Sequence, residues 1–152
     1  MQTFQGDITG NSATVTNLTI TSATEVGQAW TTPSFSAGNF TALAGTWTVE
    51  EADVTTYAYI ITGKMMTVSF VIETTTITLG TERLYIKIPN SKVATKAMYT
   101  NLPWLLDNGV VVSGRCKVDA GGTLIQILPD LGTFTGGTNN NGVYGQITFE
   151  IN

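Results

Sequence analysis

Apolar and polar residues alternate along most of this chain. The clearest run is C-terminal, where Val143, Gly145, Ile147, Phe149 and Ile151 share one face and polar residues occupy the other. Alternation with a period of two is typical of a β-strand that buries one face. The same pattern predicts further strands over residues 46–49, 57–62, 66–72, 84–88, 110–118 and 125–127. Residues 74–79 either extend the 66–72 strand or form a strand that follows it. We therefore expect about eight strands between residues 45 and 152.

Short turn sequences separate these runs. Gly63 and Lys64 join two runs as a tight hairpin would, and residues 119–122 form another short connection. Short connections favour antiparallel neighbours, and many short strands spaced by turns indicate a sandwich or a barrel. The pattern thus predicts an all-β fold, an antiparallel β-sandwich with jelly-roll-like topology.

Two stretches depart from the alternation, and we expect them to be irregular. Pro103 should keep its segment out of a regular strand, so one helical turn is predicted near residues 102–107. The glycine-rich stretch 132–142 is predicted to be an exposed, mobile loop. The segments 99–107 and 136–142, with the strand that follows, supply candidate receptor contacts: Tyr99, Trp104, Asn139, Asn140, Asn141 and Tyr144. Exposed aromatic side chains stack on sugar rings and anchor interfaces, although Trp104 could also be a core lid or a subunit contact.

Residues 1–29 differ from the rest of the chain. They are mostly Thr, Ser, Asn, Gln, Gly and Ala, which leaves too little apolar surface to offset the entropy of ordering one copy. The segment therefore either stays disordered or is ordered by other copies of itself. We expect the second, a β-rich or extended stalk that precedes a head domain over residues 30–152. Candidate contacts between copies are Val15, Leu18 and Ile20 in the stalk and Trp30 at its junction with the head.

The charge of the chain and the length of its apolar runs argue against two classes of partner. Charged residues make up 12% of the sequence, the net charge is −4, and only seven residues are basic. Nucleic-acid binding requires clustered Lys and Arg, so nucleic acid is not expected as a partner. No apolar run approaches the roughly 20 residues of a membrane span, so we expect no membrane insertion. The N-terminus also lacks the pattern of a secretion signal, so if the protein works outside cells we expect it to leave by another route, such as lysis or assembly into a particle.

The residue inventory gives little support to catalysis. There is no histidine, and Cys116 is the only cysteine, which its alternating strand places in the core. No nucleotide-binding motif occurs, and we expect no metal and no cofactor. The acidic group Glu50, Glu51 and Asp53 is interpreted as a solvated turn. A weak calcium site and a glycoside-cleaving carboxylate pair are the alternatives.

Several segments together resemble the C-terminal heads of tailed-bacteriophage fibre and receptor-binding proteins. The segments are WTTPSF (30–35), FTALAGTWTV (40–49), YAYIITGKMMTVSF (57–70) and LYIKIP (84–89). In such heads a W-x-P entry precedes a Gly-x-Trp strand, a strand ending in Gly-Lys, and a long strand with alternating apolar residues. The N-terminal GDITGN (6–11) is similar to the repeats of phage fibre shafts.

This resemblance implies a non-enzymatic, homotrimeric protein on the capsid or tail surface of a virion. The trimer would display β-sandwich heads that attach to a glycan or protein on the host-cell surface, and its N-terminus would contact other virion proteins. An alternative is a capsid decoration or head-fibre protein that is anchored by residues 1–29. A glycan depolymerase, with carboxylates at a subunit interface, is a third possibility.

Overall fold

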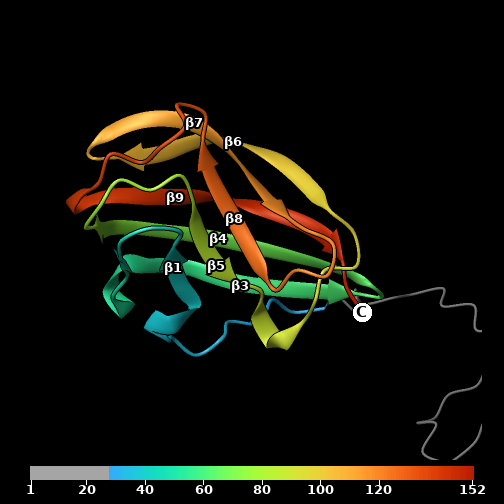
Figure 1. The fold of residues 1–152 in the computed structure, drawn as a ribbon. Helices are drawn as coiled ribbons and strands as arrows, with labels where there is room; N and C mark the ends of the chain where they lie inside the picture. The colour runs from blue at the N-terminus through green and yellow to red at the C-terminus, as the bar shows by residue number, and fades with distance from the viewer. Residues whose placement is uncertain (1–27) are drawn as a thin grey trace, which may run out of the picture.

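The structure, a computed structural model, describes residues 28–152 (Figure 1). The predicted stalk, with its candidate contacts Val15, Leu18 and Ile20, lies outside the described residues and stays a prediction. The described residues form one β domain, and no helix in residues 28–152 is long and apolar enough to cross a membrane.

Nine strands make up the domain, and every pair of neighbours is antiparallel. The all-β, antiparallel prediction is therefore confirmed. The strands are β1 (Phe40–Ala42), β2 (Trp47–Thr48), β3 (Val54–Thr62), β4 (Met65–Ile77), β5 (Leu84–Lys87), β6 (Met98–Asp107), β7 (Val110–Val118), β8 (Leu124–Pro129) and β9 (Gly137–Glu150). Three single 3₁₀ turns accompany them: η1 (Ala37–Asn39), η2 (Glu51–Asp53) and η3 (Pro89–Ser91).

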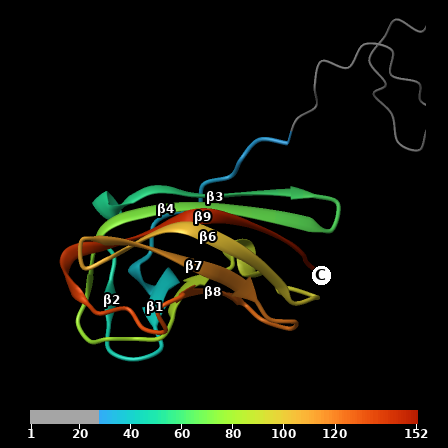
Figure 2. The same cartoon turned by 90° about the horizontal axis from the view of Figure 1, so that it is seen from above.

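The strands form one sheet that curves over on itself. Their order is β1-β5-β8-β7-β6-β9-β4-β2, and β3 pairs with the first part of β4. Three of the pairs are nested in sequence, β6 with β7, β5 with β8 and β4 with β9, which is a jelly-roll-like winding. Figures 1 and 2 show the result as two layers: β3, β4, β9 and β6 lie together, while β5 and β8 cross over them. Strands β1 and β2 approach each other, so the sheet almost closes.

Alternation decides which side chains fill the space between the layers. On β4 the residues Met66, Val68, Phe70 and Ile72 are fully buried, while the residues between them face outward. The buried face of β9 and the isoleucines of β5 and β8 pack against them in a single cluster. Fully burying each large apolar side chain contributes about 1.5–3 kcal/mol, so this cluster is the main source of stability.

Two polar side-chain groups inside this core form hydrogen bonds. The indole Nε1 of Trp47 donates to Thr75 Oγ1 at 2.8 Å, and the hydroxyl of Tyr57 donates to the backbone carbonyl of Lys87. The second bond joins β3 to the end of β5 and thus ties the two layers together. Cys116 lies in the core as predicted, and burial raises the pKa of its thiol to about 12.

The helical turn predicted near residues 102–107 is wrong, because this segment belongs to strand β6. Proline is tolerated there because the strand bulges: Leu102 pairs with Gly114 and Leu105 with Val112, which leaves two residues of β6 opposite one of β7. The strand then turns into β7 through Asn108 and Gly109, whose φ angles of 47° and 80° suit a tight hairpin.

The loop predicted over residues 132–142 is correct only in its first part, because β9 begins at Gly137. Side chains hold this segment in place. The buried carboxylate of Asp107 accepts hydrogen bonds from the backbone N–H and the hydroxyl of Thr135, at 2.8 Å each. Asn141 is also buried, and its amide bonds to the backbone of neighbouring segments. Local composition indicated a loop, but these long-range hydrogen bonds impose a strand.

Candidate functional site

An exposed aromatic pair lies on the outer face of the layer that contains β6 and β9. The ring centroids of Trp104 and Tyr144 are 5.6 Å apart, with 39° between the ring planes. Leu105 pairs with Val143 across the two strands, so the residues beside them, Trp104 and Tyr144, become neighbours on the opposite face. The side chain of Trp104 is 54% exposed. The prediction that Tyr99 and Tyr144 lie on or near outer faces is confirmed. Trp104, for which the sequence also allowed a core lid, is exposed.

A bulge in β6 turns Trp104 outward. Leu102 and Leu105 both point into the core, although they are three positions apart and strict alternation would place them on opposite faces of the strand. The two residues between them, Pro103 and Trp104, are both exposed. A bulge bends a strand and redirects its side chains, so Trp104 stands on the surface instead of returning to the core.

A second bulge, in β4, brings a carboxylate to the aromatic pair. Ile72 pairs with Val143 and Thr75 with Asn141, which leaves Glu73 and Thr74 of β4 unpaired opposite a single residue of β9. The hydroxyl of Tyr144 donates to Glu73 Oε1 at 3.0 Å. Partial burial, and then the hydrogen bond and charge of Glu73, raise the pKa of Tyr144, so its hydroxyl keeps its proton and acts as a donor at neutral pH.

A third bulge, in β3, completes this arrangement. Val54 pairs with Ile72 and Thr56 with Val71, so Thr55 is the extra residue of β3. Its hydroxyl donates to Glu73 Oε2 at 3.0 Å. Trp104, Tyr144, Glu73 and Thr55 therefore form one continuous row across β6, β9, β4 and β3. Bulges are frequent beside functional sites because they redirect side chains, and here three of them meet in one row.

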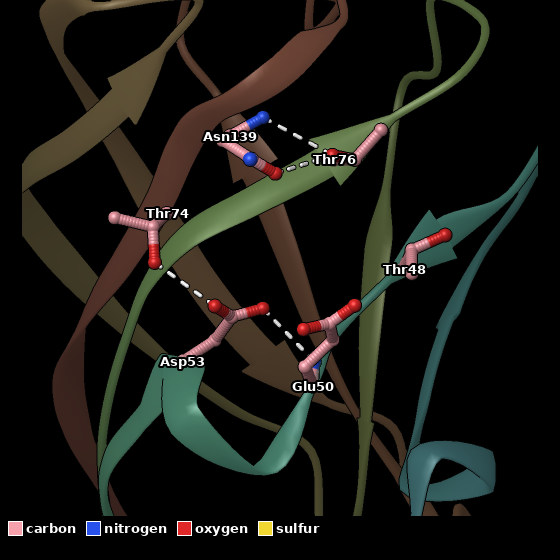
Figure 3. A pocket seen from close by; sticks show the side chains of 6 residues that line it. All are labelled: Thr48, Glu50, Asp53, Thr74, Thr76 and Asn139. Atoms are coloured by element: carbon pink, nitrogen blue, oxygen red, sulfur yellow. Dashed lines mark hydrogen bonds between the residues drawn. The ribbon is translucent and has the colours of Figure 1, made fainter.

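A small polar pocket of about 130 Å³ adjoins this row (Figure 3). Thr74, which follows Glu73 in the bulge, lines the pocket and donates to Asp53 Oδ1 at 2.9 Å. The other oxygen of Asp53 accepts from the backbone N–H of Glu50, also at 2.9 Å. The lining residues come from β2, from η2 with the residue before it, and from β4 and β9: Thr48, Glu50, Asp53, Thr74, Thr76 and Asn139.

Asn139 is fixed on the far side of the pocket by a reciprocal pair of hydrogen bonds. The hydroxyl of Thr76 donates to its Oδ1 at 3.0 Å, and its backbone N–H donates to Thr76 Oγ1 at 3.1 Å (Figure 3). Its side-chain NH₂ is then a donor that can face a ligand. The pocket thus combines carboxylates, hydroxyls and one amide, next to an apolar aromatic surface.

This combination suits a ligand with hydroxyl groups on its edges and an apolar face. Carboxylate oxygens accept hydrogen bonds from hydroxyls, and an exposed Trp ring offers a flat apolar surface. A sugar ring has both features. Residues 28–152 contain no group of three or more Asp, Glu, Cys or His side chains placed to hold a metal ion.

The structure brings together three of the six predicted receptor contacts: Trp104 and Tyr144 in the row, and Asn139 in the pocket. The choice of Asn141 is wrong, because its side chain is only 1% exposed and is committed to the backbone. Asn140 is exposed but lies toward Asn108, whose Oδ1 accepts from its amide at 3.4 Å.

Tyr99 and Trp30 are exposed but lie apart from the row. Tyr99 is on the first part of β6, beside β7, with the ammonium of Lys117 5.8 Å from its ring centroid. Trp30 is 48% exposed and precedes Thr31, which bridges to Tyr59 at the edge of the sheet. Its predicted role in contacts between copies stays a prediction.

Sequence reasoning missed the parts played by Thr55, Glu73 and Thr74. Residues 51–53 form a turn as predicted, but Asp53 also forms one wall of the pocket. One signal was available. Ile72 and Ile77 are both buried yet lie five residues apart, so the two-residue alternation changes phase between them. A change of phase inside a strand is the sequence signature of a bulge.

Comparisons with known proteins add no further constraint. No protein-family model, no curated protein and no solved structure matches this chain. The geometry of the row and the pocket is therefore the basis on which a function can be inferred.

Proposed function

We propose that this chain is a non-enzymatic, homotrimeric surface protein of a virion whose heads attach to a glycan on the host-cell surface. The observation that carries the proposal is the aromatic pair Trp104–Tyr144 beside a pocket of hydrogen-bonding groups. The flat face of a sugar would lie on the Trp104 ring, and its hydroxyls would reach Glu73 and the pocket. Tyr144 is held by Glu73, so little side-chain entropy would be lost on binding.

The shallowness of the site is consistent with attachment by several weak contacts. A pocket of about 130 Å³ is smaller than the roughly 300–1,000 Å³ of sites that enclose a ligand. One head would therefore bind weakly. Three linked heads would raise the overall avidity by about 10²–10⁴-fold when they engage one surface together.

The position of the first described residues is compatible with a stalk. Thr31 bridges to Tyr59 on β3, with both backbone hydrogen bonds at 2.8–2.9 Å. The chain joins the head beside β3, on the side away from β1 and β8 (Figure 2). In the proposal, residues 1–29 assemble with those of two other copies and contact other virion proteins.

The attachment proposal is tested by binding of the purified protein to host cells or to their isolated surface glycans. Trp104→Ala should weaken binding about tenfold or more, as expected for a central aromatic contact. The proposed site does not include Tyr99, which the sequence also suggested as a contact, so Tyr99→Ala is the control: Tyr99 is a 60% exposed aromatic residue of the same strand outside the row. Equal binding by the wild type and Trp104→Ala would contradict the proposal.

The assembly proposal is tested by light scattering on the full chain and on a chain lacking residues 1–29. A trimer that dissociates on truncation would place the assembly contacts in the N-terminal segment. A trimer that survives truncation would place them in the heads. A monomeric full chain would contradict the trimeric proposal.

A further inference from the structure

We infer that the site selects saccharides without anionic groups and rejects those that carry carboxylate, sulfate or phosphate. This inference rests on the proposed glycan attachment and adds the chemical class of the glycan. It follows from the charges around Trp104 and Tyr144 and from the hydrogen-bonding capacity that their neighbours keep free.

The charges of the domain are unevenly distributed. The row and the pocket contain Glu73, Asp53 and Glu50, and no residue that lines the pocket is basic. The seven basic residues occupy other elements. Arg83, Lys87, Arg115 and Lys117 lie on or next to β5 and on β7, and Lys64, Lys92 and Lys96 lie at the β3–β4 turn and between η3 and β6.

The basic residues with described partners are engaged away from the site. Lys117 pairs with Asp119 at 3.0 Å, and Lys96 pairs with Glu150 at 2.7 Å. Arg115 is exposed on β7, the strand next to β6, where its backbone is in register with Asn101, and it does not line the pocket. An anionic sugar that spans the row and the pocket would therefore meet three carboxylates, with no lysine or arginine among the pocket residues to offset them.

The carboxylates retain acceptor capacity for hydroxyl groups. Each oxygen of Asp53 accepts one hydrogen bond within the protein, and so does each oxygen of Glu73. A carboxylate has about four acceptor sites, so each of these groups can accept further bonds from a ligand. Sugar hydroxyls supply the matching donors. A ligand carboxylate, sulfate or phosphate supplies only acceptors and adds like charge.

Two charge-removing variants follow from this arrangement. Glu73→Gln keeps an amide oxygen that can accept from Tyr144, and its NH₂ can donate to Thr55 Oγ1, so the row should retain its shape. Asp53→Asn likewise keeps one side-chain oxygen, which can accept a hydrogen bond from the hydroxyl of Thr74 or from the backbone N–H of Glu50. Glu82→Gln is the control, because Glu82 is exposed and lies outside the row and the pocket.

The test is binding of the full chain to an array of surface polysaccharides that includes uncharged members and members rich in uronic acid, sulfate or phosphate. We expect the glycans whose binding is lost in Trp104→Ala to be uncharged or amino-bearing. The double variant Glu73→Gln, Asp53→Asn should gain at least about tenfold in binding to anionic polysaccharides relative to the wild type, whereas Glu82→Gln should not. Thermal unfolding of each variant checks that the domain is intact.

The salt dependence of binding to the wild-type protein provides a second measurement. Salt screens repulsion between exposed charges, so weak binding of anionic polysaccharides to the wild type should strengthen as ionic strength rises. Binding of an uncharged ligand should not change. Strong, Trp104-dependent binding to anionic glycans at low salt would overturn the inference and leave the proposed attachment intact. No Trp104-dependent binding to any glycan would overturn both.

Discussion

The Tyr144 ring occupies the space that a side chain at Gly142 would need. A Cβ atom built at position 142 would lie 3.1 Å from Tyr144 Cε2, 3.2 Å from its hydroxyl oxygen and 3.1 Å from the backbone carbonyl oxygen of Ile72. Gly142 is also the single β9 residue opposite the bulge at Glu73 and Thr74. The glycine thus lets the ring fold back across its own strand and reach the carboxylate that holds it.

Replacing Gly142 with alanine should displace Tyr144 from Glu73. Overpacking lowers the free energy of unfolding by about 1–3 kcal/mol. Removing the glycine restricts the unfolded chain, which raises the free energy of unfolding by about 0.4–1 kcal/mol. Because the ring can move into solvent, we expect a net destabilisation near 1 kcal/mol and a weaker Trp104–Tyr144 exciton band in circular dichroism. Thr148→Ala, at an exposed position of the same strand, is the control. An unchanged band in Gly142→Ala would show that the ring tolerates the methyl group.

The asparagine run of β9 offers a matched comparison of buried and exposed amides. The side chain of Asn141 donates to the carbonyls of Gly137 and Thr75 at 2.8 and 3.2 Å and accepts from the N–H of Asn108 at 3.0 Å. Asn141→Ala would leave these groups unpaired, at about 1–3 kcal/mol each where water cannot replace the amide. We expect a loss of about 3 kcal/mol in urea unfolding.

The neighbouring variant Asn140→Ala is the control for Asn141→Ala. Asn140 is exposed and makes one long side-chain hydrogen bond, so its loss should change the free energy of unfolding by no more than about 0.5 kcal/mol. Similar effects of the two variants would contradict a structural role for the buried amide of Asn141.

The hydroxyl of Tyr57 should contribute to stability through the link between the two layers. Its ring is buried against Phe40, with centroids 5.5 Å apart, and its hydroxyl donates to the carbonyl of Lys87. Tyr57→Phe keeps the ring but leaves that carbonyl without its donor, so we expect a loss of about 1–3 kcal/mol in thermal or urea unfolding. Tyr59→Phe, at a partly buried position of the same strand, should cost clearly less.

Burial of Cys116 should make the domain less stable at alkaline pH. Its thiol pKa rises from 9.0 to about 12 on folding because burial disfavours the thiolate. Below pH 9 the thiol is protonated in both states and its contribution is complete. Between pH 9 and 12 only the unfolded chain loses the proton, so stability should fall with a slope on the order of 1 kcal/mol per pH unit.

Two measurements check the behaviour of Cys116. Cys116→Ala should reduce the slope of unfolding free energy just above pH 9. Burial also raises the pKa of Tyr57 above its ordinary value of 10.0. Tyr57 therefore adds to the pH dependence of the unfolding free energy only above pH 10.0. In the native wild type, a thiol reagent should react slowly at about pH 8 and rapidly after denaturation. Fast reaction of the folded protein would contradict the buried position.

Much of the fold was predictable because the core is built from alternating residues. The β9 pattern from Val143 to Ile151 and the β4 pattern from Met66 to Ile72 each fix a buried face, and burial of that face needs no knowledge of the partner strand. The same alternation places the side chain of Cys116 inside and that of Tyr144 outside. These are local consequences of the two-residue repeat of a strand.

The row and the pocket could be identified only from the tertiary structure. Strand order decides that Trp104, Tyr144, Glu73 and Thr55 become neighbours, although they come from four strands. Hydrogen bonds from distant residues turned a glycine-rich stretch into β9 and withdrew Asn141 from the surface. The order of apolar and polar residues along the chain is enough to specify which face each strand buries. The pairing of distant strands decided which outward side chains meet, because no local pattern encodes the register between strands.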